Sequence, residues 1–233
     1  MKEKTSPDTS DLQFNVASPA GHVTISFTDN GVRPENAVIK DAELYGTPLG
    51  IIIDKVSVPF ETGDNVADVT VRLLDAMGIK HECTGTVDDG FYLSALKDFE
   101  FNGKYYPTLG EFDAGSQSGW CVRLNNWHIN QGASAFEVED GDTVTWLYTC
   151  QYGADVGADF SNKSAEITGI VFAENYGTLA PEFGKDVKEY KYTVAEDINS
   201  IAMEIKLDNY ASVVTVKVDG NQVKYRPNKA IAV

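Results

Sequence analysis

The stretch LNNWHINQGASAFEVEDGDTVTWLY, residues 124–148, decides how the first part of this chain folds. Near its end Val144, Trp146 and Tyr148 alternate with other residues, which is the period-2 pattern of a β-strand with one apolar face. The acidic run Glu139-Asp140-Gly141-Asp142 precedes that strand. Its carboxylates could be offered to calcium, but the ligand spacing of an EF-hand is absent and Asp-Gly favours a turn. We therefore interpret the stretch as turns that join strands.

The strands on both sides of these turns should contribute aromatic residues to one core. Alternation puts Trp120, Val122 and Leu124 on a common face of the first strand. On the second strand the shared face carries Val144, Trp146, Tyr148 and Cys150. Cys121 points the other way, so we expect no disulfide between Cys121 and Cys150.

Trp127 is harder to assign to the core, because it lies between Asn126 and His128 in a predicted turn. An exposed Trp with neighbouring amides can stack on a flat ligand or sugar ring and hydrogen-bond to its edge. The alternative is a Trp that folds down over one end of the sheet. The predicted ligand-binding residues are Trp127, Asn125, Asn126, Tyr152, Trp120 and Tyr148.

Upstream of this region the sequence predicts two strands and one helix. GHVTISFT (21–28) alternates apolar and polar residues, and residues 51–60 form a second strand candidate after an irregular loop over 29–50. We expect the helix to begin at an N-cap on Asp64 and to end before Gly78. Its apolar stripe, which we interpret as a core face, consists of Val66, Val69, Leu73 and Met77.

Short β-type segments fill the rest of the chain. Five follow the helix, at 90–96, 104–109, 119–125, 134–140 and 142–150, and four more lie at 167–172, 189–195, 200–207 and 212–225. The sequence thus predicts a polar segment (1–19), a β-rich α+β domain with one packed helix (20–158), a linker (159–166) and an all-β, sandwich-like domain (167–233), which looks truncated.

The charge of the chain limits the classes of molecule that it can bind. The formal net charge is −16, and residues 1–164 hold 25 acidic against 11 basic residues. Such a field repels nucleic acid and anionic lipid surfaces. No apolar run is long enough to cross a membrane, so we expect no membrane insertion by this segment.

Sequence motifs for catalysis and metal binding are weak. Gly115-Ser-Gln-Ser-Gly119 resembles a nucleophile elbow, but its middle position is Gln117 and not Ser. His81-x-Cys83 is the only close His/Cys pair, and zinc requires four ligands. We therefore expect no catalytic residue, no bound metal and no enzymatic activity.

Residues about 20–160 contain the motifs Ser118-Gly119-Trp120, Leu124-Asn125, Asn130-x-Gly132, Asp140-Gly141-Asp142, Trp146-x-Tyr148-Thr149 and Gly153-x-Asp155-x-Gly157. At these positions the segment resembles the bacterial surface domain that is related to the C-terminal domain of transcobalamin and intrinsic factor. The resemblance implies a compact β-rich domain with one helix. In the vitamin carriers this domain covers one face of cobalamin, so cobalamin is implied here by resemblance only, and we expect no resident cofactor.

Residues about 165–233 contain Ile170, Leu179-x-Pro181-x-Phe183, Tyr190-x-Tyr192-x-Val194 and Val213-x-Thr215-Val216. At these positions the segment is similar to the cadherin-like β-sandwich repeat of bacterial surface proteins. Members continue with further strands where this sequence stops, so we expect an incomplete repeat.

Together these features predict a non-enzymatic binding or adhesion module at the bacterial cell surface or outside the cell. A recognition domain would be carried on a β-sandwich spacer and would contact a protein or glycan partner. The alternative is a protein that binds a small flat ligand, such as a glycan or a cobalamin-like molecule, through its aromatic and Asn surface.

Overall fold

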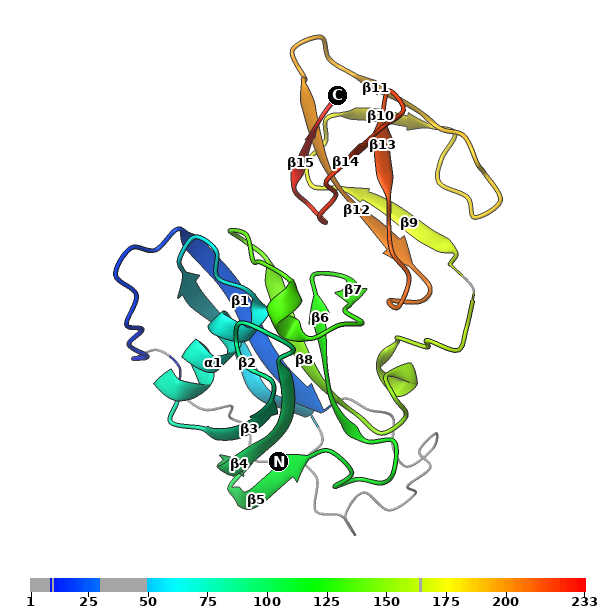
Figure 1. Ribbon diagram of the computed structural model, residues 1–233. Coiled ribbons are helices and arrows are strands. Elements are labelled where there is room, and N and C mark those ends of the chain that lie inside the picture. Colours follow the sequence, from blue (N-terminus) through cyan, green and yellow to red (C-terminus); the bar gives the residue numbers. More distant parts are fainter. Residues whose placement is uncertain (1–8, 10, 30–49, 164) are drawn as a thin grey trace. The chain divides into compact units, whose positions relative to one another are not determined.

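The computed structural model describes residue 9 and residues 11–29, 50–163 and 165–233. Within this part the chain forms two compact units, one of residues up to 124 with 128–159, and one of residues 125–127 with 160–233 (Figure 1). Most of the loop predicted over 29–50, and most of residues 1–10, lie outside the described residues. No helix in the described part is both long and apolar enough to cross a membrane.

A five-stranded sheet organises the first unit. Its strand order is β2 (Gly50–Phe60), β1 (Gly21–Asp29), β8 (Thr143–Thr149), β6 (Gly119–Leu124) and β7 (Trp127–His128). The β1–β8 pair is parallel, whereas β1–β2 and β6–β8 are antiparallel. The strands predicted at 21–28, 51–60, 119–125 and 142–150 are therefore confirmed.

The helix α1 spans Val66–Ala76, and its N-cap is Asn65 rather than the predicted Asp64. Asn65 Oδ1 accepts from the backbone N–H groups of Ala67 and Asp68, and Asp68 Oδ2 accepts in return from Asn65 N at 2.9 Å. This is a capping box, which satisfies N–H groups that the first turn leaves without a helical partner. Asp64 instead accepts from the Arg72 guanidinium at 2.7 Å.

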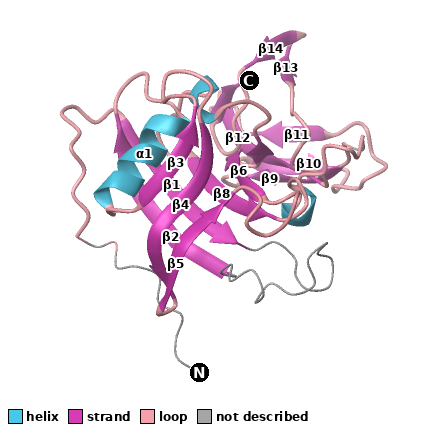
Figure 2. Cartoon of the chain, turned by 60° about the horizontal axis from the view of Figure 1, so that its bottom comes forward, coloured by secondary structure: helices cyan, strands magenta, loops and turns pink. Residues whose placement is uncertain are grey.

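A second, three-stranded sheet of the first unit has the order β3 (Lys80–Thr84), β4 (Tyr92–Phe101) and β5 (Lys104–Gly110). Figures 1 and 2 show this sheet and α1 against the strands of the larger sheet. The short helices η1 (Ala133–Ala135) and η2 (Ala154–Val156) follow later in the chain. The strand predicted at 134–140 is wrong, because Phe136 O and Val138 N bond to the start of the helical segment rather than to a sheet neighbour.

The core between these layers is aromatic. Trp120, Trp146 and Tyr148 are at most 2% exposed, which confirms their interpretation as core residues. The indole of Trp146 stacks on Phe27, with ring centroids 6.1 Å apart. Polar atoms of the same residues connect the layers, through Trp120 Nε1 to Leu109 O at 2.9 Å, Tyr148 Oη to Gly110 O at 2.7 Å and Trp146 Nε1 to Thr70 Oγ1 at 2.9 Å.

The acidic run forms the predicted turn and is attached to β1. Asp142 is fully buried, and its Oδ2 accepts from Glu139 N at 2.7 Å. Asp140 Oδ1 accepts from His22 N at 2.8 Å, while Gly141 N donates to His22 O at 2.8 Å. These carboxylates therefore hold the turn and the start of β1 together.

The helices and strands assigned to the described residues of the second unit are all strands. The strands β15 (Ala230–Ala232), β12 (Ser200–Leu207) and β9 (Ile167–Phe172) form one sheet, and two hairpins pair β10 (Gly177–Ala180) with β11 (Lys191–Val194) and β13 (Val216–Val218) with β14 (Asn221–Val223). The four predicted segments of this part all contain a strand, which supports the all-β prediction. Ala202, Ile205 and Ile231 are its only buried apolar residues among those described.

We predict that Thr70→Val destabilises the first unit by about 1–3 kcal/mol, because it leaves the Trp146 indole N–H buried without an acceptor. The Thr70 hydroxyl accepts from Trp146 Nε1 and donates to Val66 O at 2.6 Å, so both bonds are lost at nearly constant volume. Urea unfolding followed by Trp fluorescence measures the change.

Thr145→Val, on the opposite face of β8 where the side chain is half-buried, is the matched control. It should change the free energy of unfolding by less than about 0.5 kcal/mol. Equal effects of the two variants would contradict a special role for the Trp146–Thr70 bond.

Candidate functional site

The structure distributes the predicted ligand-binding residues over three places. Trp120 and Tyr148 lie in the core, as described above. Asn125 and Asn126 form the turn after β6, in which Asn125 adopts a left-handed φ of 57°, and the half-buried Trp127 begins β7 directly after it. This turn groups with the second unit. Tyr152 follows β8 and belongs to the first unit.

Tyr152 is the most exposed of the predicted residues, with 65% of its surface accessible. Its backbone N donates to Gln117 O at 3.1 Å, and its hydroxyl donates to Ser116 O at 3.2 Å. The side chain thus lies along the loop that leads into β6, whereas Asn125, Asn126 and Trp127 follow the other end of that strand. The structure does not gather the predicted aromatic and amide residues into one loop.

Phe112 is a second exposed aromatic residue at the same loop, and sequence reasoning missed it. It is 60% exposed, and its backbone N donates to Ser118 O at 3.0 Å. Phe112 and Tyr152 therefore bond to consecutive carbonyls, those of Ser118 and Gln117. The signal in the sequence was an aromatic residue three positions before the Gly115-Ser-Gln-Ser-Gly119 motif, which we considered only as a nucleophile elbow.

The backbone at both aromatic residues is unusual. Phe112 has a φ of 65° and Tyr152 a φ of 49°. The other described non-glycine residues with positive φ are all Asn or Asp, which tolerate this region because their short side chains bond locally. A bulky aromatic residue gains no such compensation, and strained backbone of this kind concentrates at functional sites.

We call Phe112, Ser116, Gln117 and Tyr152 the 112/152 surface. Its polar side chains are uncharged. Ser116 is exposed and offers a hydroxyl, and Gln117 is half-buried and offers an amide. The surface can therefore combine ring stacking with hydrogen bonds from uncharged groups, which suits a flat or ring-shaped molecule.

The support beneath this surface is tightly packed. A Cβ on Gly119 would lie only 2.9 Å from the Tyr92 hydroxyl, so a larger residue there would require the Tyr92 side chain to shift. Burial, together with the nearby Glu111 carboxylate, raises the pKa of Tyr92 to about 12, and its hydroxyl stays neutral. Asp113 Oδ2 fixes the loop start by accepting from Gly110 N at 2.7 Å.

His128 lies in β7 and is buried, with 1% of its surface accessible. Burial, and to a lesser degree the Arg123 guanidinium, lowers the pKa of His128 to about 4. The imidazole is therefore neutral at pH 7.

The cysteines and acidic residues form no metal cluster in the described part of the chain, where no group of three or more His, Cys, Asp or Glu side chains is arranged to hold an ion. Cys83, Cys121 and Cys150 are thiols. Cys121 Sγ donates to Leu147 O at 3.2 Å, and burial raises its pKa far above the ordinary value.

Comparison with known proteins gives a family match over part of the first unit. Residues 63–149 match the model of a family described as a domain of unknown function (DUF4430). The matched segment runs from just before α1 to the end of β8 and includes Phe112 but not Tyr152. No curated protein matches the chain.

We predict that His128 makes the protein less stable in acid. Its folded pKa of about 4 lies below the ordinary value of 6.5, so the unfolded chain binds the extra proton first, and stability falls as the pH drops from about 6.5 towards 4. Between pH 7 and 4.5 this contributes a loss of about 2 kcal/mol. Urea unfolding at both pH values measures it.

His128→Gln should remove this part of the acid sensitivity, even though it lowers stability at pH 7. His22→Gln, at an exposed position of β1, is the control and should keep the wild-type difference. If His128→Gln and wild type lose the same free energy between the two pH values, the assignment to His128 is wrong.

Proposed function

We propose that the chain is a non-enzymatic binding module of the bacterial cell exterior, and that its first unit recognises a ligand through the 112/152 surface. A rigid β-rich scaffold presents two exposed rings there, and the strained backbone of Phe112 and Tyr152 supports the proposal most strongly. Strain at two bulky residues is retained only where the surrounding structure over-determines it, and ligand recognition gives a reason for it.

The chemistry of the surface favours a neutral sugar ring. Aromatic faces stack on the C–H groups of a sugar, while Ser116 and Gln117 can bond to its hydroxyls. The net charge of −16 disfavours an anionic ligand over the molecule as a whole. A glycan on a cell or matrix surface has the required combination of neutral hydroxyls and apolar ring faces.

The second unit serves in this proposal as a spacer that carries the recognition unit. Its described strands form one three-stranded sheet and two short hairpins, and this all-β architecture supports that assignment. The extracellular location rests on the resemblance of the two segments to bacterial surface domains and is compatible with the acidic surface.

We predict that the full chain binds a member of a panel of neutral oligosaccharides, and that Phe112→Ala and Tyr152→Ala each weaken the binding about tenfold, because each removes one stacking face. Isothermal titration calorimetry measures the affinities. Cobalamin belongs in the panel as a flat ligand of the kind that the resemblance implies.

Tyr105→Ala is the matched control, because Tyr105 is also an exposed aromatic residue, at 55%, but lies in β5. It should bind like the wild type. Failure of all neutral oligosaccharides to bind, or equal binding by the three variants, would refute the glycan proposal. Cobalamin binding that depends on Phe112 and Tyr152 would replace the glycan by a flat cofactor at the same surface.

A further inference from the structure

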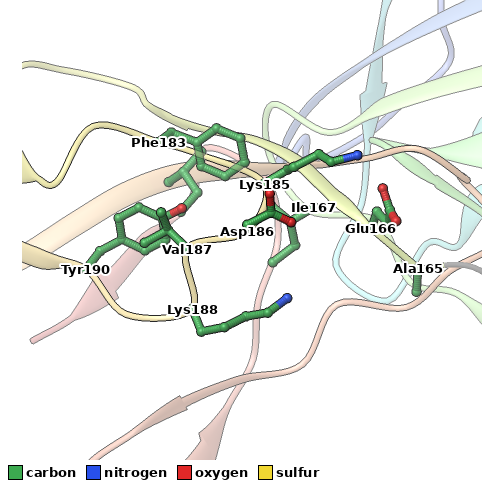
Figure 3. A pocket seen from close by; sticks show the side chains of 10 residues that line it. Ala165, Glu166, Ile167, Phe183, Lys185, Asp186, Val187, Lys188 and Tyr190 are labelled. Atoms are coloured by element: carbon green, nitrogen blue, oxygen red, sulfur yellow. The ribbon is translucent and has the colours of Figure 1, made fainter.

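A hollow of about 380 Å³ lies within the second unit, between the start of β9 and the loop that joins β10 to β11 (Figure 3). Its volume falls in the range of about 300–1,000 Å³ that is typical of small-molecule sites. Every residue that lines it belongs to residues 165–190, so the site is complete within this unit.

The floor of the hollow is apolar. Ile167 and Ile170 come from β9, and Phe183, Val187 and Tyr190 come from the facing loop. The rings of Phe183 and Tyr190 stack with centroids 6.0 Å apart and planes 12° from parallel. The Ile167 side chain is part of this floor and is still 45% exposed, so its apolar surface is available to a ligand.

The loop that carries the charged rim is tied down by its own hydrogen bonds. Tyr190 Oη donates to Gly184 O at 2.8 Å and accepts from Gly184 N at 3.2 Å. Val187 N also donates to Gly184 O, at 2.9 Å, and closes a turn around Lys185 and Asp186. The turn residues are thereby held at the mouth of the hollow, which reduces the entropy lost when a ligand binds.

Two cations and two anions line this mouth. Figure 3 shows Lys185 and Lys188 on either side of Asp186 and Ile167, with Glu166 beside them. Within the described residues, none of these four charged side chains forms an ion pair at 4.0 Å or less. A purely anionic ligand at the lysines would be repelled by Asp186, which lies between them. A purely cationic ligand at Asp186 would be repelled by the two lysines.

We infer that the hollow binds a short apolar peptide with free termini, whose carboxylate contacts Lys185 and Lys188 and whose ammonium group contacts Asp186 and Glu166. The peptide side chains lie on the floor formed by Ile167, Ile170 and the Phe183–Tyr190 pair. A zwitterion satisfies both kinds of charge, and its apolar side chains replace water over the exposed isoleucine. The second unit is then a binding domain in its own right, independently of the 112/152 surface.

The probe for this inference is the dipeptide leucyl-phenylalanine, titrated into the full chain and followed by calorimetry and by the amide NMR signal of Gly184. We expect saturable binding. N-acetylation and C-amidation of the dipeptide should each weaken it about fivefold, because each removes one charge from the ligand.

The variant Lys185→Gln/Lys188→Gln should weaken the zwitterionic dipeptide about fivefold and leave the C-amidated one unchanged, because the lysines act on the carboxylate. Lys217→Gln, an exposed lysine in β13, is the control and should bind like the wild type. All three lysines are exposed, so these variants keep the fold, which circular dichroism verifies.

The inference is overturned if the dipeptide gives no saturable signal, or if the neutral N-acetylated and C-amidated form binds equally well. It is also overturned if the double lysine variant binds the free and the amidated peptide as the wild type does. Because no sugar is involved and no residue of the first unit is changed, these outcomes are independent of whether the 112/152 surface binds a glycan.

Discussion

The hydrogen bond between the Trp146 indole and the Thr70 hydroxyl is the contact on which the first unit depends. It joins the central sheet to the helix inside an apolar core, where an indole N–H without an acceptor would be expensive. Thr70 also donates its own proton to Val66 O within the helix, so its buried hydroxyl is satisfied both as donor and as acceptor. This pair of polar atoms therefore joins β8 to α1 directly, within a core of stacked rings.

The elements with strong periodicity were predictable from the sequence. Val23, Ile25 and Phe27 alternate along β1, and the burial of Trp120, Trp146 and Tyr148 followed from parity alone. Short-range patterns failed where the partner lies far away in sequence. The N-cap is Asn65 rather than its neighbour Asp64, because the Asp64 carboxylate forms an ion pair with Arg72 of the same helix. The segment 134–140 has strand-like residues but meets the helix start instead of a sheet edge.

The candidate site was only partly visible in the sequence for a similar reason. Tyr152 was named because it is an aromatic residue after a strand, but nothing in its neighbourhood indicated that Phe112 lies at the same loop. Their proximity comes from backbone bonds to Gln117 and Ser118, whose partners cannot be read from residue types. The hollow of the second unit was likewise hidden, because it arises where a strand and a loop leave space between them, and packing defects carry no sequence motif.

The parallel pairing of β1 with β8 sets Thr24 beside Thr143 and so joins the two ends of the first unit. The matched family segment, residues 63–149, begins after the end of β2 and so includes neither β1 nor β2. The region that sequence comparison delimits is therefore smaller than the region that must fold together, since it lacks β1, the strand that pairs with β8. On the ribosome, β1 would have to remain without β8 until more than a hundred further residues had been synthesised, which makes this a slow, high-contact-order sheet whose assembly is completed late.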